Sequence, residues 1–128
     1  MLELLADARR AGRVGAVVAF IVRRATDADA PALGRHGGML LRAHHAFDPQ
    51  RFIAPGADPE GGYQWFLQTQ LNEENAAVFV ADRQGAVIGY VFAGLEPISW
   101  KDLREACGFI HDVAVDEAAR RGGVATAL

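Results

Sequence analysis

Apolar and polar positions follow two different periods along this chain, and the order of these periods predicts its elements. Four runs of β-branched and apolar residues predict strands, at residues 17–24, 77–81, 86–95 and 109–115. After the first strand, helix N-cap residues followed by Pro31 predict a helix over residues 26–47. Apolar residues at helical spacing predict a second helix over residues 63–74, and a last short helix should begin after residue 122.

This order, β-α-α-β-β-β-α, predicts a mixed, largely antiparallel sheet flanked by helices. The fold class is therefore α/β (α+β type), and not a doubly wound sheet. At 128 residues the chain has the length of one domain. We expect residues 1–16 to form a short amphipathic N-terminal extension and residues 17–128 to form the domain.

Glycine and proline mark the expected interruptions of these elements. Gly37 and Gly38 predict a break or flexible joint in the first helix, because each costs about 1 kcal/mol relative to alanine. Residues 48–62 contain three prolines and three glycines, and predict a long loop of the kind that often covers a site. Residues 82–85 predict a hairpin turn, and Gly89 predicts a bulge or a close backbone approach.

Net charge, hydropathy and cysteine content indicate which kinds of binding partner and which cellular compartment to expect. The net charge of −3 argues against nucleic acid as a partner, because proteins that bind phosphate backbones usually carry a basic excess. The longest apolar run, residues 14–22, is too short to cross a bilayer. Cys107 is the only cysteine, so no intrachain disulfide can form. We therefore expect a cytoplasmic protein without a membrane partner.

The most informative stretch is GFIHDVAVDEAARRGGVATAL, from residue 108 to residue 128. A buried strand leads through an acidic turn into an arginine and glycine bend, which runs into a helix start. Unpaired backbone N–H groups and the helix dipole favour an anion there. Arg120 and Arg121 can add charge-assisted hydrogen bonds, and Gly122 and Gly123 let the backbone approach a ligand. The stretch predicts a cradle for phosphate or pyrophosphate.

The same stretch resembles a known family. Val115, Arg120, Gly123 and Ala125 fit the V-x(4)-[RQ]-x-x-G-x-[GA] signature of the GNAT superfamily of acyl-CoA-dependent N-acetyltransferases. FIHDVAV is similar to that family's fourth strand, FIVRRATDADAPAL to its first strand and first helix start, and VFVADRQGAVIGYVFAGLE to its second and third strands. The resemblance covers about residues 20–128. It implies transfer of an acetyl group from acetyl-CoA to a primary amine of a small-molecule, peptide or protein acceptor.

The resemblance also implies which residues hold coenzyme A. Backbone groups of Val113 and Val115, with Ala114 between them, would pair with the pantetheine arm. A main-chain N–H on this strand would face the thioester oxygen. The pyrophosphate would lie in the cradle, against Arg120, Arg121, Gly122, Gly123, Val124, Ala125 and Thr126.

The amine must lose a proton, and three residues are candidates for the base: Glu96, Asp112 and His111. By resemblance to where the family often carries its acid, Glu96 ranks first and Asp112 second. Either can instead be a solvated acid at a strand end. Neighbouring residues on a strand face opposite sides, so we expect His111 and Asp112 not to serve one site.

Histidines and aromatic residues offer weaker signals. His44 and His45 are adjacent, so they do not share a helix face, and no metal-binding spacing accompanies them. No metal is expected, and the pair is a substrate contact or, more simply, a surface pair. Four aromatic residues are candidates for an acceptor pocket or for the core: Tyr63, Phe66, Trp65 and Trp100.

The sequence stops at Leu128, whereas the family continues with more strands and another helix. We therefore expect a C-terminally incomplete domain that lacks the C-terminal strands and leaves the fourth strand as an apolar edge. The alternative function is a non-catalytic acyl-CoA-binding or dimerisation module, which could form a homodimer. Catalysis predicts release of coenzyme A with some amine, and a module predicts a stable oligomer without turnover.

Overall fold

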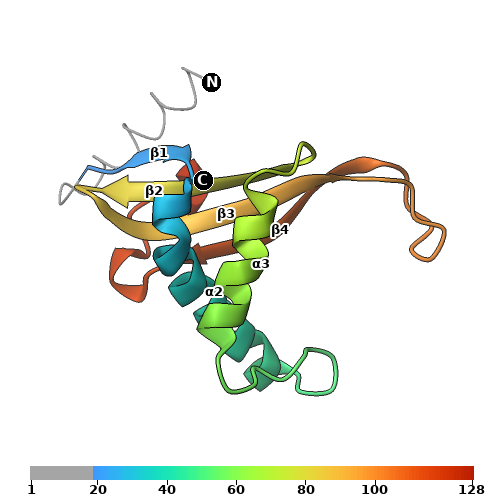
Figure 1. Cartoon of the computed structure of the whole chain (residues 1–128). Helices are drawn as coiled ribbons and strands as arrows, with labels where there is room; N and C mark the ends of the chain where they lie inside the picture. The colour runs from blue at the N-terminus through green and yellow to red at the C-terminus, as the bar shows by residue number, and fades with distance from the viewer. Residues whose placement is uncertain (1–18) are drawn as a thin grey trace.

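The structure is a computed structural model that describes residues 19–128 (Figure 1). The predicted N-terminal extension and the first two residues of the first predicted strand lie outside the described residues. Along the chain the elements are β1 (Ile21–Arg24), η1 (Asp27–Asp29), α2 (Ala30–Phe47), α3 (Pro59–Gln70), β2 (Ala76–Arg83), β3 (Ala86–Glu96), β4 (Cys107–Val115), η2 (Glu117–Ala119) and α4 (Val124–Ala127).

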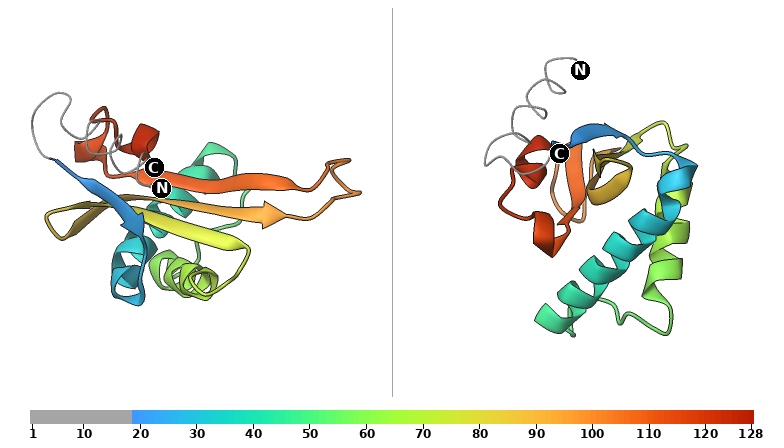
Figure 2. Two further views of the ribbon diagram at one scale, coloured as in Figure 1. Left: turned by 90° about the horizontal axis from the view of Figure 1, so that it is seen from above. Right: turned by 90° about the vertical axis from the view of Figure 1, so that its left-hand side faces the viewer.

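The predicted sheet and its flanking helices are confirmed. The four strands form one sheet in the order β1-β2-β3-β4, and each neighbouring pair is antiparallel. Helices α2 and α3 lie side by side on one face of the sheet, and η2 and α4 lie on the other (Figures 1 and 2). Strands β3 and β4 continue past the helices as a long arm, which ends in the loop between them.

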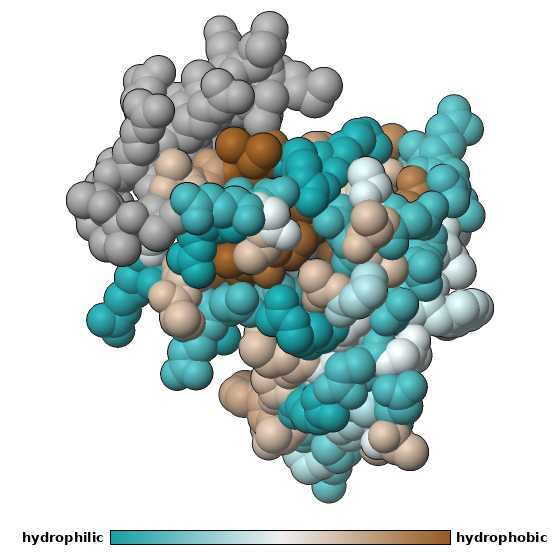
Figure 3. Space-filling model, turned by 60° about the vertical axis from the view of Figure 1, so that its left-hand side comes forward, coloured by the Kyte–Doolittle hydropathy of each residue, from teal (hydrophilic) through white to brown (hydrophobic). Residues whose placement is uncertain are grey.

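Each face of the sheet carries its own hydrophobic core. On the helical face the buried residues are Leu33, Leu67, Val78, Val80, Val87, Tyr90, Phe92 and Ala114. On the other face they are Phe20, Ala81, Ile88, Val115, Ala119 and Val124. On the face shown in Figure 3, hydrophilic side chains cover much of the surface, and the most hydrophobic residues gather in its upper half.

Two single-residue bulges interrupt the regular alternation of side chains between the two faces of the sheet. The register passes from Ala81↔Gly89 to Asp82↔Val87, so Ile88 is an extra residue on β3. A Cβ on Gly89 would lie 2.8 Å from the Ala114 carbonyl oxygen, so this position has both the bulge and the close approach that were predicted. The register then passes from Phe92↔Asp112 to Ala93↔Ile110, which makes His111 an extra residue on β4.

The predicted break in the first helix is wrong, because α2 continues through Gly37 and Gly38. Both glycines are buried, and a Cβ on Gly37 would lie only 2.2 Å from Cδ1 of Tyr63. A Cβ on Gly34 would lie 2.7 Å from Cβ of Gln64. These glycines let α3 approach α2 closely, and that packing outweighs their low helix propensity.

The predicted loop is shorter than expected, because the second helix begins at Pro59. The carboxylate of Asp58 caps this helix by accepting a hydrogen bond of 2.9 Å from the Gly61 amide. The loop between α2 and α3 therefore comprises residues 48–58. The hairpin turn is confirmed: Gln84 and Gly85 have φ values of 53° and 87°, and Asp82 Oδ1 accepts from the Gly85 amide at 2.7 Å.

Charged side chains fasten the β1 end of the sheet. Arg23 donates to Asp29 at 2.8 and 2.9 Å and to Asp82 at 3.0 Å, which joins β1 to η1 and β2. The hydrogen bonds from Arg23 hold the pKa of the buried Asp29 carboxyl below its usual value. Among residues 19–128, no helix has the length and apolar character needed to cross a membrane.

Candidate functional site

The predicted cradle follows the end of β4 directly. The Asp116 amide donates to the Ile88 carbonyl at 2.8 Å, so the chain stays fixed to β3 as it leaves the sheet. After η2, Arg121 and Gly123 have φ values of 68° and 82°, and this left-handed backbone turns the chain into α4. Val124 is buried in the second core cluster and anchors the start of the helix.

The cradle residues combine exposed cations with a tight backbone. Arg120, Arg121, Ala125 and Thr126 are exposed, whereas Gly122 and Gly123 are half-buried. Nε of Arg120 donates to the Val115 carbonyl at 3.2 Å, which holds this side chain against the end of the strand. A Cβ on Gly122 would lie 3.3 Å from the Ala119 carbonyl oxygen. The turn therefore presents two arginines beside a backbone with little side-chain cover.

A polar cluster that the sequence did not reveal joins α2 to the start of this turn. Asp116 Oδ1 lies 3.1 Å from Nη1 of Arg35 and 2.7 Å from Nε2 of the buried His36. The histidine contact is close but poorly aligned for a hydrogen bond, and Nδ1 of the same ring lies 2.8 Å from the Ala32 carbonyl. About eighty residues separate the partners along the chain, so no local pattern could have predicted the cluster.

A cavity of about 240 Å³ opens on β4 before the cradle. It is enclosed by the second half of α2, the loop after it, α3 and β4. Its lining residues are Leu40, Leu41, His44, Phe52, Ile53, Tyr63, His111 and Asp112. It therefore contains one of the two predicted acids and the histidine beside it.

Asp112 is held by the only two tyrosines of the chain. The hydroxyls of Tyr63 on α3 and Tyr90 on β3 both donate to Oδ2 of Asp112, the second at 3.0 Å. Oδ1 has no hydrogen-bond donor among residues 19–128. Burial raises the pKa of both phenols, and the neighbouring Asp112 carboxylate raises it further. One carboxylate oxygen is thus fixed, while the other stays free to bind a ligand.

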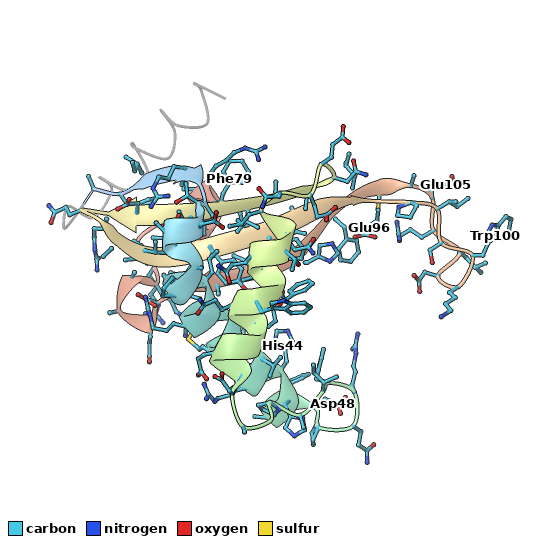
Figure 4. The ribbon with its side chains drawn as sticks, viewed as in Figure 1. His44, Asp48, Phe79, Glu96, Trp100 and Glu105 are labelled. Carbon is cyan, nitrogen blue, oxygen red and sulfur yellow. The ribbon has the colours of Figure 1, made fainter. Side chains whose placement is uncertain are left out.

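Glu96 and His111 form a second pair near the same cavity. Oε1 of Glu96 lies 2.9 Å from Nε2 of His111, and the imidazole stacks on the Phe92 ring with the centroids 4.8 Å apart. Glu96 itself does not line the cavity, so it reaches the cavity through His111. Figure 4 shows Glu96 where the arm leaves the helices, well back from Trp100 at its tip.

The expectation that His111 and Asp112 would not serve one site is wrong, because both line this cavity. The alternation of side chains assumes regular pairing, and the extra residue at His111 interrupts it. In the sequence, the glycine on β3 signalled one bulge, but no glycine or proline marks the bulge on β4.

A second cavity of about 350 Å³ adjoins the first and shares Leu41, Ile53 and Tyr63 with it. Phe66 lines this second cavity. Tyr63 and Phe66 also pack against the core, which is one of the two roles expected of them. Trp65 and Trp100 are 68% and 81% exposed and line neither cavity.

His44 and His45, near the end of α2, contact the loop that borders the cavity. His44 lines the first cavity and packs edge-to-face on Phe52, with the ring centroids 4.8 Å apart. Nδ1 of His45 lies 3.0 Å from the Phe52 carbonyl. Within residues 19–128, no three His, Cys, Asp or Glu side chains come together in a group that could hold a metal ion.

Comparison with known proteins identifies the family. The family model described as "Acetyltransferase (GNAT) family" matches residues 40–128, which include the cavity, β4 and the cradle. This chain belongs to the GNAT acetyltransferase family. A search of curated proteins found no significant match.

Solved structures share the GNAT fold with this chain. A variant of the BH1408 protein from Bacillus halodurans matches with a TM-score of 0.64 and 23% identity, over 83% of this chain and 68% of that one. An acetyltransferase from Vibrio fischeri matches with a TM-score of 0.58 and 22% identity, over 83% and 77% of the two chains. The crystal structure of a predicted acetyltransferase with acetyl-CoA, from Clostridium acetobutylicum, matches with a TM-score of 0.55 and 17% identity. The match covers 84% of this chain and 66% of that one. At these identities the likeness concerns the fold.

Proposed function

We propose that this GNAT protein transfers an acetyl group from acetyl-CoA to a primary amine. The observation that carries the proposal is that one strand, β4, borders the cavity and then leads into the arginine and glycine turn. The stretch from Asp112 to Asp116 spans about 13 Å of extended strand. A cosubstrate lying along it could have its phosphates at the turn and its acyl group at the cavity.

The donor is held, in this proposal, by backbone and by charge. Strand β4 pairs with β3 on one side, and its other edge has no strand partner among residues 19–128. Backbone groups alternate between the two edges of a strand, so those of Val113 and the N–H of Val115 face the open edge, whereas Ala114 between them pairs with Tyr90. The outward groups suit an extended pantetheine arm. The pyrophosphate is held at the turn, by Arg120, Arg121, Gly122, Gly123, Val124, Ala125 and Thr126. The acetyl-CoA in the Clostridium acetobutylicum structure supports this choice of donor.

Acetyl transfer forms a C–N bond between the amine and the thioester carbonyl carbon, and breaks the C–S bond. The amine gives up a proton, and the coenzyme A thiolate takes one. We assign the two acids different parts in this reaction. Glu96 takes part in proton removal through His111, with which it is paired at 2.9 Å. Asp112 has one oxygen fixed by two tyrosines, so its free oxygen attracts and orients the amine.

The first test is a calorimetric titration of the 128-residue chain with acetyl-CoA, with ATP and NAD as controls. We expect selective micromolar binding that is lost in Arg120→Ala and in Gly123→Asp. The second change forces a side chain onto a backbone with φ of 82°. Gly85→Asp is the matched control, because Gly85 has φ of 87° and lies in the hairpin turn between β2 and β3, outside both cavities.

The second step measures thiol release from acetyl-CoA with primary amines. Release that depends on both the amine and the protein supports catalysis. Binding without release by any amine would contradict the enzyme and favour a non-catalytic acyl-CoA-binding module. Equal binding of acetyl-CoA, ATP and NAD would contradict the assignment of the donor.

A further inference from the structure

The two cavities form one cleft with a distinct chemistry. They share three residues, so the space beside Asp112 continues between α2 and α3 to the loop of residues 48–58. Away from β4 most of its lining side chains are apolar, among them Leu41, Phe52, Ile53, Pro55 and Phe66, and the polar ones there are His44, Tyr63 and Asp58. A cleft of about 240 and 350 Å³ in its two parts has the size of a small-molecule site.

Charge is confined to the ends of the cleft. Asp112 borders the end at β4, and Asp58 borders the far end. Oδ1 of Asp58 already accepts the Gly61 amide as a helix cap. Among residues 19–128, no lysine or arginine lines either part. Each end of the cleft therefore has one carboxylate oxygen without a donor in this part of the chain, Oδ1 of Asp112 at β4 and Oδ2 of Asp58 at the far end, and the surface between them is largely apolar.

The wall of this cleft is braced from outside. Arg42 on α2 makes two hydrogen bonds to the Glu60 carboxylate on α3, one of them at 3.1 Å. The Phe52 carbonyl lies 3.0 Å from Nδ1 of His45, which ties the loop to α2. Ile53 nevertheless remains 75% exposed at the rim. An apolar ligand in the cleft would cover this side chain, and burial of its apolar surface would favour binding.

Resting on the proposed acetyl transfer, we propose that the acceptor is a small primary amine with an apolar body, such as an alkylamine or a phenylalkylamine. Its nitrogen lies at Asp112 and His111, and its hydrocarbon part lies between α2 and α3. A polyamine such as spermidine suits the cleft poorly, because its internal nitrogen would lie between the two acids, against Leu41 and Ile53, which accept no hydrogen bond.

The test measures kcat/KM for thiol release from acetyl-CoA along the series propylamine, butylamine, pentylamine and hexylamine, with 2-phenylethylamine and spermidine added. Each methylene that enters an apolar site contributes about a fourfold gain, so kcat/KM should rise about fourfold per step until the cleft is filled. Spermidine should fall at least tenfold below hexylamine.

Two variants test whether the dependence of kcat/KM on chain length arises in this cleft. Ile53→Ser should flatten the dependence of kcat/KM on chain length, and its exposed position spares the fold. Ile98→Ser is the matched control, since Ile98 is 51% exposed on the arm and lines neither cavity. It should leave the whole series unchanged.

The outcomes separate this proposal from the proposed function. Turnover of spermidine at or above that of hexylamine, or no gain along the alkyl series, would overturn the apolar acceptor and leave acetyl transfer standing. A gain along the alkyl series that is unchanged in Ile53→Ser, or that is lost equally in Ile98→Ser, would overturn the assignment to this cleft. Thiol release with a polar primary amine but with none of these would overturn the apolar acceptor alone, and no release with any primary amine would overturn both proposals.

Discussion

Raising the pH should leave both tyrosines of this chain protonated until the fold itself is lost. Tyr63 and Tyr90 are the only tyrosines, and both donate to Asp112. Burial first, and the Asp112 carboxylate second, raise the pKa of each phenol above its unperturbed value near 10. Above pH 10 the unfolded chain therefore loses two protons that the folded chain keeps.

The sign and size of the effect follow from this difference. Because the folded pKa values are raised, their contribution to stability is fully present below pH 10 and is lost as the pH rises beyond it. Each retained proton costs about 1.4 kcal/mol per pH unit, so two lower the free energy of unfolding by up to about 2.7 kcal/mol per unit. Tyr63 is only half-buried, which makes this an upper bound. Domains are typically stable by roughly 5–15 kcal/mol, so alkaline unfolding should begin within a few units of pH 10.

The assay follows tyrosinate absorbance and far-ultraviolet circular dichroism together. The two signals should change at the same pH, in one transition steeper than the loss of a single proton. Asp112→Asn keeps an acceptor but removes the charge, so tyrosinate should form at lower pH and stability at neutral pH should fall by about 1–3 kcal/mol. Glu96→Gln is the control, because Glu96 bonds to neither tyrosine. Gradual ionisation around pH 10 with unchanged circular dichroism would refute the reasoning.

Two further predictions concern packing and the β1 end of the sheet. Gly37→Ala should destabilise the protein to urea by about 2 kcal/mol or more, because its Cβ would lie 2.2 Å from Tyr63, whereas Gly62→Ala in α3, with nothing within 4 Å, should be neutral or stabilising. Arg23→Ala should cost about 3 kcal/mol at neutral pH by leaving the buried Asp29 carboxylate unpaired. Since Arg23 lowers the pKa of Asp29, that stability is present above about pH 4 and is lost as the pH falls. The difference in free energy of unfolding between the wild type and Arg23→Ala should therefore shrink in acid. A difference that does not change with pH would contradict the prediction.

Elements whose signals are local could be predicted from the sequence. The turn at residues 82–85 followed from Gly85 and a preceding aspartate, and the structure has that turn with φ of 87° at Gly85. The start of α3 also had a local signal, Asp58 before Pro59, which is a common cap and first-turn pair. The density of proline and glycine in the loop outweighed that signal, so the helix was predicted over residues 63–74, which begins and ends four residues later than Pro59–Gln70.

Features set by a distant partner could not be predicted. Gly37 and Gly38 carry a real propensity penalty, but the sequence does not show that Tyr63 and Glu60 pack against them. Asp112 was a candidate by its position on the fourth strand, yet nothing local shows that two tyrosines bind one of its oxygens. The acids were therefore found as candidates, while the structure was needed to show that Asp112 is fixed by two tyrosines and that Glu96 is paired with a histidine.

The bulge on β4 explains how these residues meet at one cavity. On its C-terminal side, Ala114 lies in the core beneath the helices and Val115 lies in the core of the opposite face, so Asp112 shares the helical face with Ala114. On its N-terminal side the odd-numbered residues occupy the other face than Val115 does, because His111 contacts both Phe92 and Phe109. Regular pairing would have turned either His111 or Asp112 away from the helices. The extra residue lets an acid anchored in the core and a histidine paired with Glu96 on the arm border the same space, and it does so on the strand that leads into the cradle.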